Sequence, residues 1–171
     1  LREEPTKAET KKAAKPVGKV SFVGAGPGDA RLLTVRAAEL LATADVVIIE
    51  SPEQAALVTN DADVIDGGAS ADGAVLTHAA RAKLVVKHAK TGAHVVRLMT
   101  GDPFTYATGP EEALACVKAD IPFEVVPGIS SVGAVPAYAG VPLTTKQNRE
   151  YKVVSVGDAN VDWTEHSNHD T

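Results

Sequence analysis

The sequence has one cysteine, few aromatic residues and no long apolar run. A single thiol, Cys116, cannot form a disulfide within the chain, and it provides no cysteine cluster for a metal. Because Cys116 falls in a helical apolar pattern, we expect a buried structural thiol. No apolar stretch reaches the roughly 18 residues of a membrane span, and the amino terminus does not read as a secretory signal. These absences predict a cytoplasmic protein with no membrane partner and no bound metal.

An excess of positive charge is also missing. The formal net charge is −5, whereas nucleic-acid binding needs a basic surface that displaces counterions from phosphates. The sequence therefore predicts no nucleic-acid partner. Lysines near the start are mixed with glutamates, so residues 1–17 are predicted to be a disordered arm. His166 and His169 lie in a polar tail, and we interpret them as solvated rather than metal-binding.

Apolar β-branched runs alternate with helical patterns from residue 19 onward. Hydrophobic residues make up 44% of the chain, which is enough for a core. Strands are predicted at residues 20–23, 44–50, 64–66, 95–99 and 123–126, and helices at residues 35–42, at residues 77–90 and from Pro110. This order predicts an α/β fold, a three-layer sandwich with a mainly parallel sheet, over residues 18–145. A further strand at residues 151–157 would begin a second α/β domain within residues 146–171.

Three turns rich in glycine and proline follow predicted strands. They are GAGPGD (residues 24–29), TGDPF (residues 100–104) and PGISS (residues 127–131). Because the carboxyl ends of parallel strands meet at one edge of a sheet, the turns should line one cleft for a small molecule. An aspartate in such a turn can accept hydrogen bonds from a ribose and face a cationic centre without repulsion. Ribose and a cationic centre are parts of an adenosyl sulfonium ligand.

The first turn also invites a dinucleotide interpretation. Gly24, Gly26 and Gly28 follow a predicted strand, as in the Rossmann fingerprint. The spacing of the third glycine differs from that pattern, however, and Asp29 adds negative charge where a pyrophosphate would lie. A nucleotide-binding Rossmann protein is therefore the weaker hypothesis, and a purely structural turn is the other alternative.

Five motifs, in this order, resemble the tetrapyrrole (corrin/porphyrin) methylase family. They are VGAGPGD (residues 23–29), RLMTGDPF (residues 97–104), Glu111-Glu112, VVPGIS (residues 125–130) and AYAGVPLT (residues 137–144). The resemblance implies two α/β domains, with S-adenosylmethionine bound in the cleft between them, and a homodimer. It also implies methyl transfer to ring carbons of uroporphyrinogen III in siroheme and cobalamin synthesis, with S-adenosylhomocysteine as product. Only the start of the second domain would be present in this sequence.

The resemblance assigns site residues by position. Contacts to S-adenosylmethionine are implied for Pro27, Thr100, Gly101, Asp102, Thr105, Ser130 and Ser131. Contacts to the tetrapyrrole are implied for Gly28, Asp29 and Tyr106. Glu50 stands where the family has its carboxylate base, which suits the chemistry because a pyrrole carbon becomes nucleophilic as its ring N–H is lost. The alternative for Glu50 is a surface residue at the end of a strand.

Several positions depart from the residues usual in the family, and three of the departures remove a cation. Glu50-Ser51, Gly67-Gly68-Ala69 and residues 107–110 stand in place of Asp-Arg, Gly-Lys-Arg and Gly-Arg-Gly-Gly. Arginine and lysine are the side chains expected to meet the carboxylates of uroporphyrinogen. The sequence thus supports cofactor binding more strongly than tetrapyrrole binding. It leaves two alternatives open: a precorrin methyltransferase, and a catalytically silent module that holds a tetrapyrrole or the cofactor for a fused neighbour.

Overall fold

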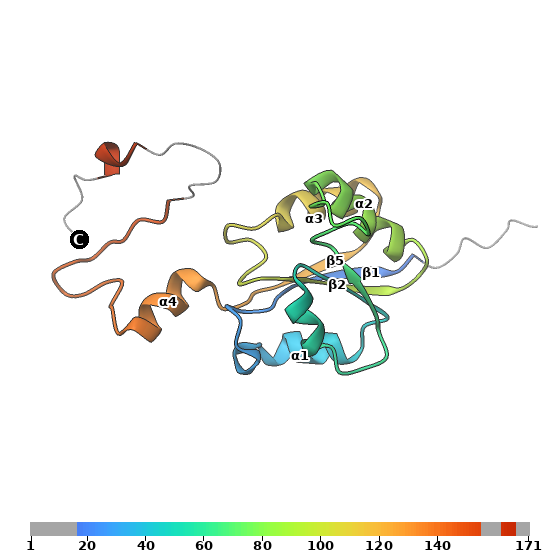
Figure 1. The fold of residues 1–171 in the computed structure, drawn as a ribbon, viewed down its shortest axis with the longest axis horizontal. Coiled ribbons are helices and arrows are strands. Elements are labelled where there is room, and N and C mark those ends of the chain that lie inside the picture. Colours follow the sequence, from blue (N-terminus) through green and yellow to red (C-terminus); the bar gives the residue numbers. More distant parts are fainter. Residues whose placement is uncertain (1–16, 155–161, 167–171) are drawn as a thin grey trace, which may run out of the picture.

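A five-stranded parallel sheet forms the centre of the computed structural model, which describes residues 17–154 and 162–166 (Figure 1). The strands are β1 (Lys19–Gly24), β2 (Val46–Ile49), β3 (Asp63–Asp66), β4 (His94–Met99) and β5 (Phe123–Val126). Their order across the sheet is β3-β2-β4-β1-β5. In the register, Val95 of β4 is opposite both Val20 of β1 and Val46 of β2. The predicted parallel sheet is confirmed.

The three middle strands supply two hydrophobic cores, one on each face of the sheet. Phe22 and Ile48 belong to one core, and their chain neighbours Val23 and Val47 belong to the other. Successive side chains of a strand point to opposite faces, so a strand covered on both faces must be apolar throughout. The continuous β-branched runs of the sequence follow from this burial.

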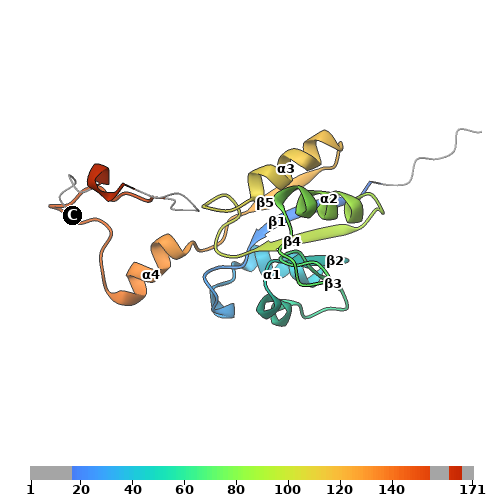
Figure 2. The ribbon, with the colours of Figure 1, turned by 45° about the horizontal axis from the view of Figure 1, so that its top comes forward.

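Helices cover both faces, which confirms the predicted three-layer sandwich (Figure 2). The helices α1 (Val35–Ala42) and η2 (Pro52–Leu57) pack on one face, and α2 (His78–Ala89) and α3 (Gly109–Lys118) pack on the other. Thr34 and Thr77 cap the first two α-helices by accepting hydrogen bonds from backbone N–H groups three residues on. Cys116 of α3 is fully buried, as expected. None of the helices in the described ranges is long and apolar enough to cross a membrane.

The topology separates two loops at the carboxyl edge of the sheet. The chain leaves β1 toward α1 on one face, and it leaves the neighbouring strand β4 toward α3 on the other face. Where adjacent strands send their chains to opposite faces, a crevice opens outside their carboxyl ends, and open α/β sheets bind ligands there. The first and second Gly/Pro turns follow these two strands.

The short helix α4 (Ser131–Ala139) lies to one side of the sandwich (Figures 1 and 2). Ser130 caps its start, and Gly140, with φ of 70°, ends it in the left-handed conformation that favours glycine. Only Ala134 of this helix is buried. The remaining elements are the 3₁₀-helices η1 (Ala30–Leu32) and η3 (Trp163–His166).

The strand predicted at residues 151–157 is wrong for the part that the structure describes. Residues 151–154 have no strand conformation. A β-strand is stabilised by pairing with a neighbour, and no described strand pairs with this segment. Residues 155–157, residues 1–16 of the predicted arm, and His169 lie outside the described residues.

Candidate functional site

A cavity of about 470 Å³ opens at the carboxyl edge of the sheet, at the crevice between β1 and β4. Small-molecule sites typically have volumes of roughly 300–1,000 Å³. The loops after β1, β2 and β4 and the start of α4 all contribute to its wall. The lining residues are Pro27, Glu50, Thr100, Gly101, Asp102, Thr105, Tyr106, Ala107, Thr108, Ser130, Ser131, Val132, Val153 and Val154. The structure thus brings together every residue predicted to contact the cofactor, and it adds Glu50 and Tyr106.

The three Gly/Pro turns meet directly behind this cavity. Gly26 and Gly101 pair through their backbones, with N···O distances of 3.2 and 2.8 Å. A side chain on Gly128 would place its Cβ 2.1 Å from the carbonyl oxygen of Gly101 and 2.7 Å from the Cα of Gly24. Glycine is therefore needed for close packing of the turns. The first α-helix begins only at Val35, so the turn has no following helix N-terminus of the kind that binds pyrophosphate in Rossmann proteins.

Asp102 joins the turn after β4 to the turn after β5. Its Oδ1 accepts hydrogen bonds from the N–H of Phe104 at 2.9 Å and from the hydroxyl of Thr105 at 3.1 Å. Its Oδ2 accepts one from the N–H of Gly128 at 3.1 Å. A carboxylate has about four acceptor positions, so capacity for a ligand remains. This aspartate both shapes the wall and lines it.

Glu50 is tied to the floor of the site rather than standing free at the end of β2. Its Oε2 accepts a hydrogen bond from the N–H of Thr100 at 2.8 Å, and its Oε1 lies 3.8 Å from Nη2 of Arg97. Arg97 is fully buried and pairs with the equally buried Glu112, at 2.9 Å between Nε and Oε2. The hydroxyl of Thr108 donates to Glu112 at 3.1 Å. A line of charges therefore runs beneath the cavity from Glu50 through Arg97 to Glu112.

Gln54 was not singled out from the sequence, and Thr108 appeared there only within residues 107–110, without a contact to Glu112. Gln54 accepts a hydrogen bond from the N–H of Glu50 at 2.8 Å and donates one to the hydroxyl of Thr100 at 3.2 Å. A local signal existed for the first contact. Pro52 favours the start of a helical turn, and such a turn brings the side chain of Gln54 back to the N–H of Glu50, four residues earlier in the chain. The contact with Thr100 has no such signal, since Gln54 lies in η2 and Thr100 follows β4, 46 residues further along the chain.

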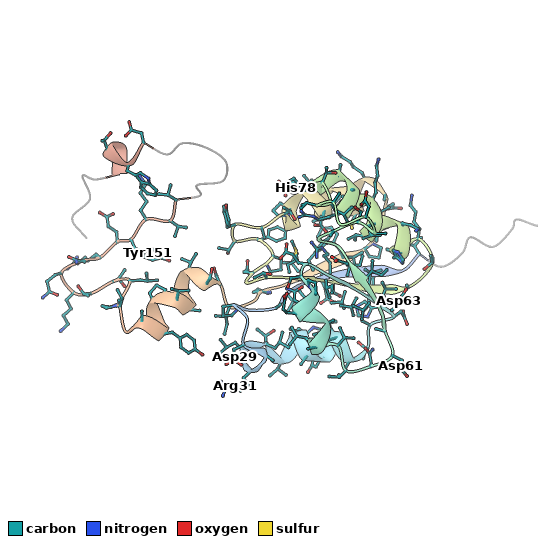
Figure 3. The ribbon with its side chains drawn as sticks, viewed as in Figure 1. Asp29, Arg31, Asp61, Asp63, His78 and Tyr151 are labelled. Atoms are coloured by element: carbon teal, nitrogen blue, oxygen red, sulfur yellow. The ribbon has the colours of Figure 1, made fainter. Side chains whose placement is uncertain are left out.

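Two of the three residues expected to bind the tetrapyrrole lie outside the cavity of about 470 Å³, which we call the main cavity. Gly28 lines a smaller cavity of about 130 Å³ beside it, and Asp29 lines a groove between the first turn and α4. Asp29 pairs with Arg31 at 2.7 Å, on the side of the molecule that carries α1 (Figure 3). The side-chain hydrogen bond from Arg31 holds the pKa of Asp29 below its ordinary value. Of the three residues, only Tyr106 lines the main cavity.

The charge of the cavity is negative. Among the lining residues that the structure describes, Glu50 and Asp102 are acidic and no lysine or arginine is present. The nearby Arg97 is covered and balanced by Glu112. Within the described ranges, no group of three or more His, Cys, Asp or Glu residues is arranged to hold a metal ion. The cavity therefore suits a ligand with a cationic centre.

The family model for the sequences of tetrapyrrole (corrin/porphyrin) methylases matches residues 19–169 of this chain. The chain belongs to this family. A siroheme synthase from Baumannia cicadellinicola subsp. Homalodisca coagulata is 47% identical over 139 residues, which are 80% of this chain and 29% of that protein. The chain thus spans less than a third of that relative. This assignment confirms the resemblance found in the five motifs.

Solved structures of the same family show the same fold. A crystal structure of uroporphyrin-III-C-methyltransferase from Thermus thermophilus matches with a TM-score of 0.65 and 38% identity, over 75% of this chain and 55% of that one. Another structure of the Thermus thermophilus enzyme, complexed with S-adenyl homocysteine, has a TM-score of 0.61 and 35% identity, over 75% and 51% of the two chains. The predicted α/β fold class is confirmed.

Proposed function

We propose that this chain forms the S-adenosylmethionine site of a methyltransferase that acts on uroporphyrinogen III in siroheme and cobalamin synthesis. The observation that carries the proposal is the convergence of Pro27, Gly101, Asp102 and Ser130 on one cavity. The relation to an enzyme crystallised with S-adenyl homocysteine supports the same ligand here. We further propose that residues 18–145 form one domain.

The residues present fit this cofactor. The carboxylates of Asp102 and Glu50 provide negative charge for a sulfonium or an amino group. The hydroxyls of Thr105, Ser130 and Ser131 can donate hydrogen bonds to, and accept them from, the ribose and the amino acid part of S-adenosylmethionine. S-adenosylmethionine, when bound, supplies an electrophilic methyl group. The turns, which are locked together through Gly26 and Gly101, hold that side of the cavity in a fixed geometry.

Glu50 is proposed as the general base. A carboxylate at the cavity floor can take the ring N–H proton of a pyrrole whose carbon is being methylated. The hydrogen bond from Thr100 and the charge of Arg97 fix the direction of this carboxylate. Tyr106 lines the cavity, is largely exposed, and is proposed to contact the tetrapyrrole. Gly28 and Asp29 are proposed to do so from the neighbouring rim.

The absence of cations among the described lining residues favours a second candidate, a cofactor-binding domain without turnover. Carboxylates of a tetrapyrrole need arginine or lysine partners, and in this candidate nothing supplies them. In the first candidate, residues outside the described ranges or the second α/β domain that the resemblance implies supply them. We also propose a homodimer, which the exposed apolar side chains Val135 and Tyr138 of α4 support. The expectation of a cytoplasmic location rests on the sequence.

Calorimetry with S-adenosylhomocysteine tests the binding step. The chain should bind one molecule, and Ser130→Ala together with Ser131→Ala should weaken the binding about tenfold or more by removing two hydroxyls. Turnover is tested with a protein that carries this chain and the second α/β domain that the resemblance implies, together with uroporphyrinogen III and a labelled methyl donor. Label in the product supports the methyltransferase, and binding without transfer supports the silent domain. A chain that does not bind S-adenosylhomocysteine contradicts both candidates.

A further inference from the structure

Gln54 links the end of β2 to the turn after β4. It lies in η2 and is only 7% exposed. Its Oε1 accepts a hydrogen bond from the N–H of Glu50 at 2.8 Å, and its Nε2 donates one to Oγ1 of Thr100 at 3.2 Å. A side-chain amide suits this position because it accepts at one end and donates at the other. A hydrophobic residue of the same size would leave both polar groups without these partners.

Thr100 is held at two points from the same loop. Its hydroxyl accepts from Gln54, and its N–H donates to the carboxylate of Glu50 at 2.8 Å. The contacts form a closed ring, because Gln54 also binds the backbone of Glu50. The next residue, Gly101, is held from the other side by the backbone of Gly26. The turn that forms the middle of the cavity wall is thus anchored on both flanks.

Gln54 itself does not line the main cavity. It lines the smaller cavity of about 130 Å³, on the other side of Thr100. Any effect of Gln54 on a ligand in the main cavity must therefore pass through Glu50 and Thr100. Both of these residues do line the main cavity.

We propose that Gln54 is a positioning residue that fixes Thr100 and Glu50 relative to each other and so sets the geometry of the cofactor side of the cavity. The expected effect of Gln54 on ligand binding rests on the proposed function. The anchoring of the turn itself can be measured without a ligand. Two experiments therefore separate the positioning role from the identity of the ligand.

The first experiment measures amide hydrogen exchange by NMR on the 171-residue chain. Gln54→Met keeps the size of the side chain and removes both hydrogen bonds. The exchange rate of the Thr100 amide, relative to that of Val96 in the middle of β4, should rise about five- to tenfold.

Asn60 offers a matched control. It is a polar side chain whose Nδ2 donates to the carbonyl oxygens of Ala42 and Ala44, at 3.3 and 3.0 Å, on the opposite edge of the sheet. Asn60→Leu should lower stability, and it should leave the ratio of the Thr100 and Val96 rates unchanged. A ratio that rises equally in Asn60→Leu and Gln54→Met would show general loosening and would overturn the proposal.

The second experiment measures the dissociation constant of S-adenosylhomocysteine by calorimetry. Gln54→Met and Thr100→Val should each weaken binding about five- to tenfold, and the double variant should be no weaker than the worse single variant. Losses that multiply in the double variant would overturn the coupling between the two residues. If the wild-type chain does not bind S-adenosylhomocysteine, the proposed function fails, and the exchange ratio still decides the role of Gln54. An unchanged exchange ratio in Gln54→Met overturns that role.

Discussion

At the scale of single residues, the buried pair of Arg97 and Glu112 should contribute to stability. Both side chains are fully buried, between β4 and α3. Removing one partner of a buried pair typically costs about 3–5 kcal/mol, and without Glu112 the buried Arg97 keeps only the more distant carboxylate of Glu50, at 3.8 Å. We expect Glu112→Leu to lower the free energy of unfolding in urea by about that amount. The double variant Arg97→Met with Glu112→Leu should recover most of the loss, and a double variant as unstable as the single one would contradict the explanation.

Cys116 provides a pH-dependent prediction at the same scale. Burial, with a smaller effect of the Glu112 charge, raises the pKa of this thiol from 9.0 to about 11. The folded state therefore holds the thiol proton more tightly than the unfolded state does, so the stability that this group contributes is complete below pH 9 and is lost as the pH rises toward 11. Across this window the free energy of unfolding should fall more steeply in the wild type than in Cys116→Val. Equal slopes in urea titrations would contradict the prediction.

At the scale of elements, the contact between the Gly/Pro turns can be tested with two Gly→Ala substitutions. A Cβ on Gly128 would meet backbone atoms of Gly101 and Gly24 well inside contact distance, so the turns must separate. We expect Gly128→Ala to cost about 1–3 kcal/mol and to abolish S-adenosylhomocysteine binding, as measured by urea unfolding and calorimetry.

Gly133 is the control for this substitution, because it lies inside α4 and, apart from the adjacent backbone of its own helix, no described atom lies within 4 Å of an added Cβ. Alanine there should stabilise the chain by about 0.5–1 kcal/mol through helix propensity, or leave it unchanged if α4 frays. Equal losses in both variants would show that the close contact of the turns is not what makes glycine necessary at position 128.

The elements themselves were predictable where their causes are local. Thr34 and the apolar spacing that follows it determine α1, and the β-branched run determines β2. The convergence of the turns was also predictable, because parallel strands end at one edge. The hydrogen bond between Glu50 and Thr100 was not, since it depends on β2 and β4 being neighbours, and nothing local specifies the strand order. The prediction of a strand at residues 151–157 was wrong in its described part for a similar reason. A strand forms only where a neighbouring strand pairs with it, and the local sequence does not specify that neighbour.

At the scale of the whole molecule, stability should be unevenly distributed. The two cores lie on the faces of the sheet, and Ala134, the one buried residue of α4, belongs to neither. Val135 and Tyr138 are 64% and 74% exposed, so the helix gains little from packing within the described part of the chain. Isolated helices shorter than about 12 residues are marginal in water.

We therefore expect the amides of Gly133 and Ala134, whose hydrogen bonds go to the carbonyl of Ser130, to exchange at least about a hundredfold faster than those of β1. Hydrogen exchange followed by NMR over a dilution series is the measurement. Fast exchange at every concentration means that neither this chain nor a second copy packs stably against α4. Protection that appears only at high concentration means that a second copy covers Val135 and Tyr138. Protection equal to that of β1 at the lowest concentration would contradict the separation of α4 from the two cores.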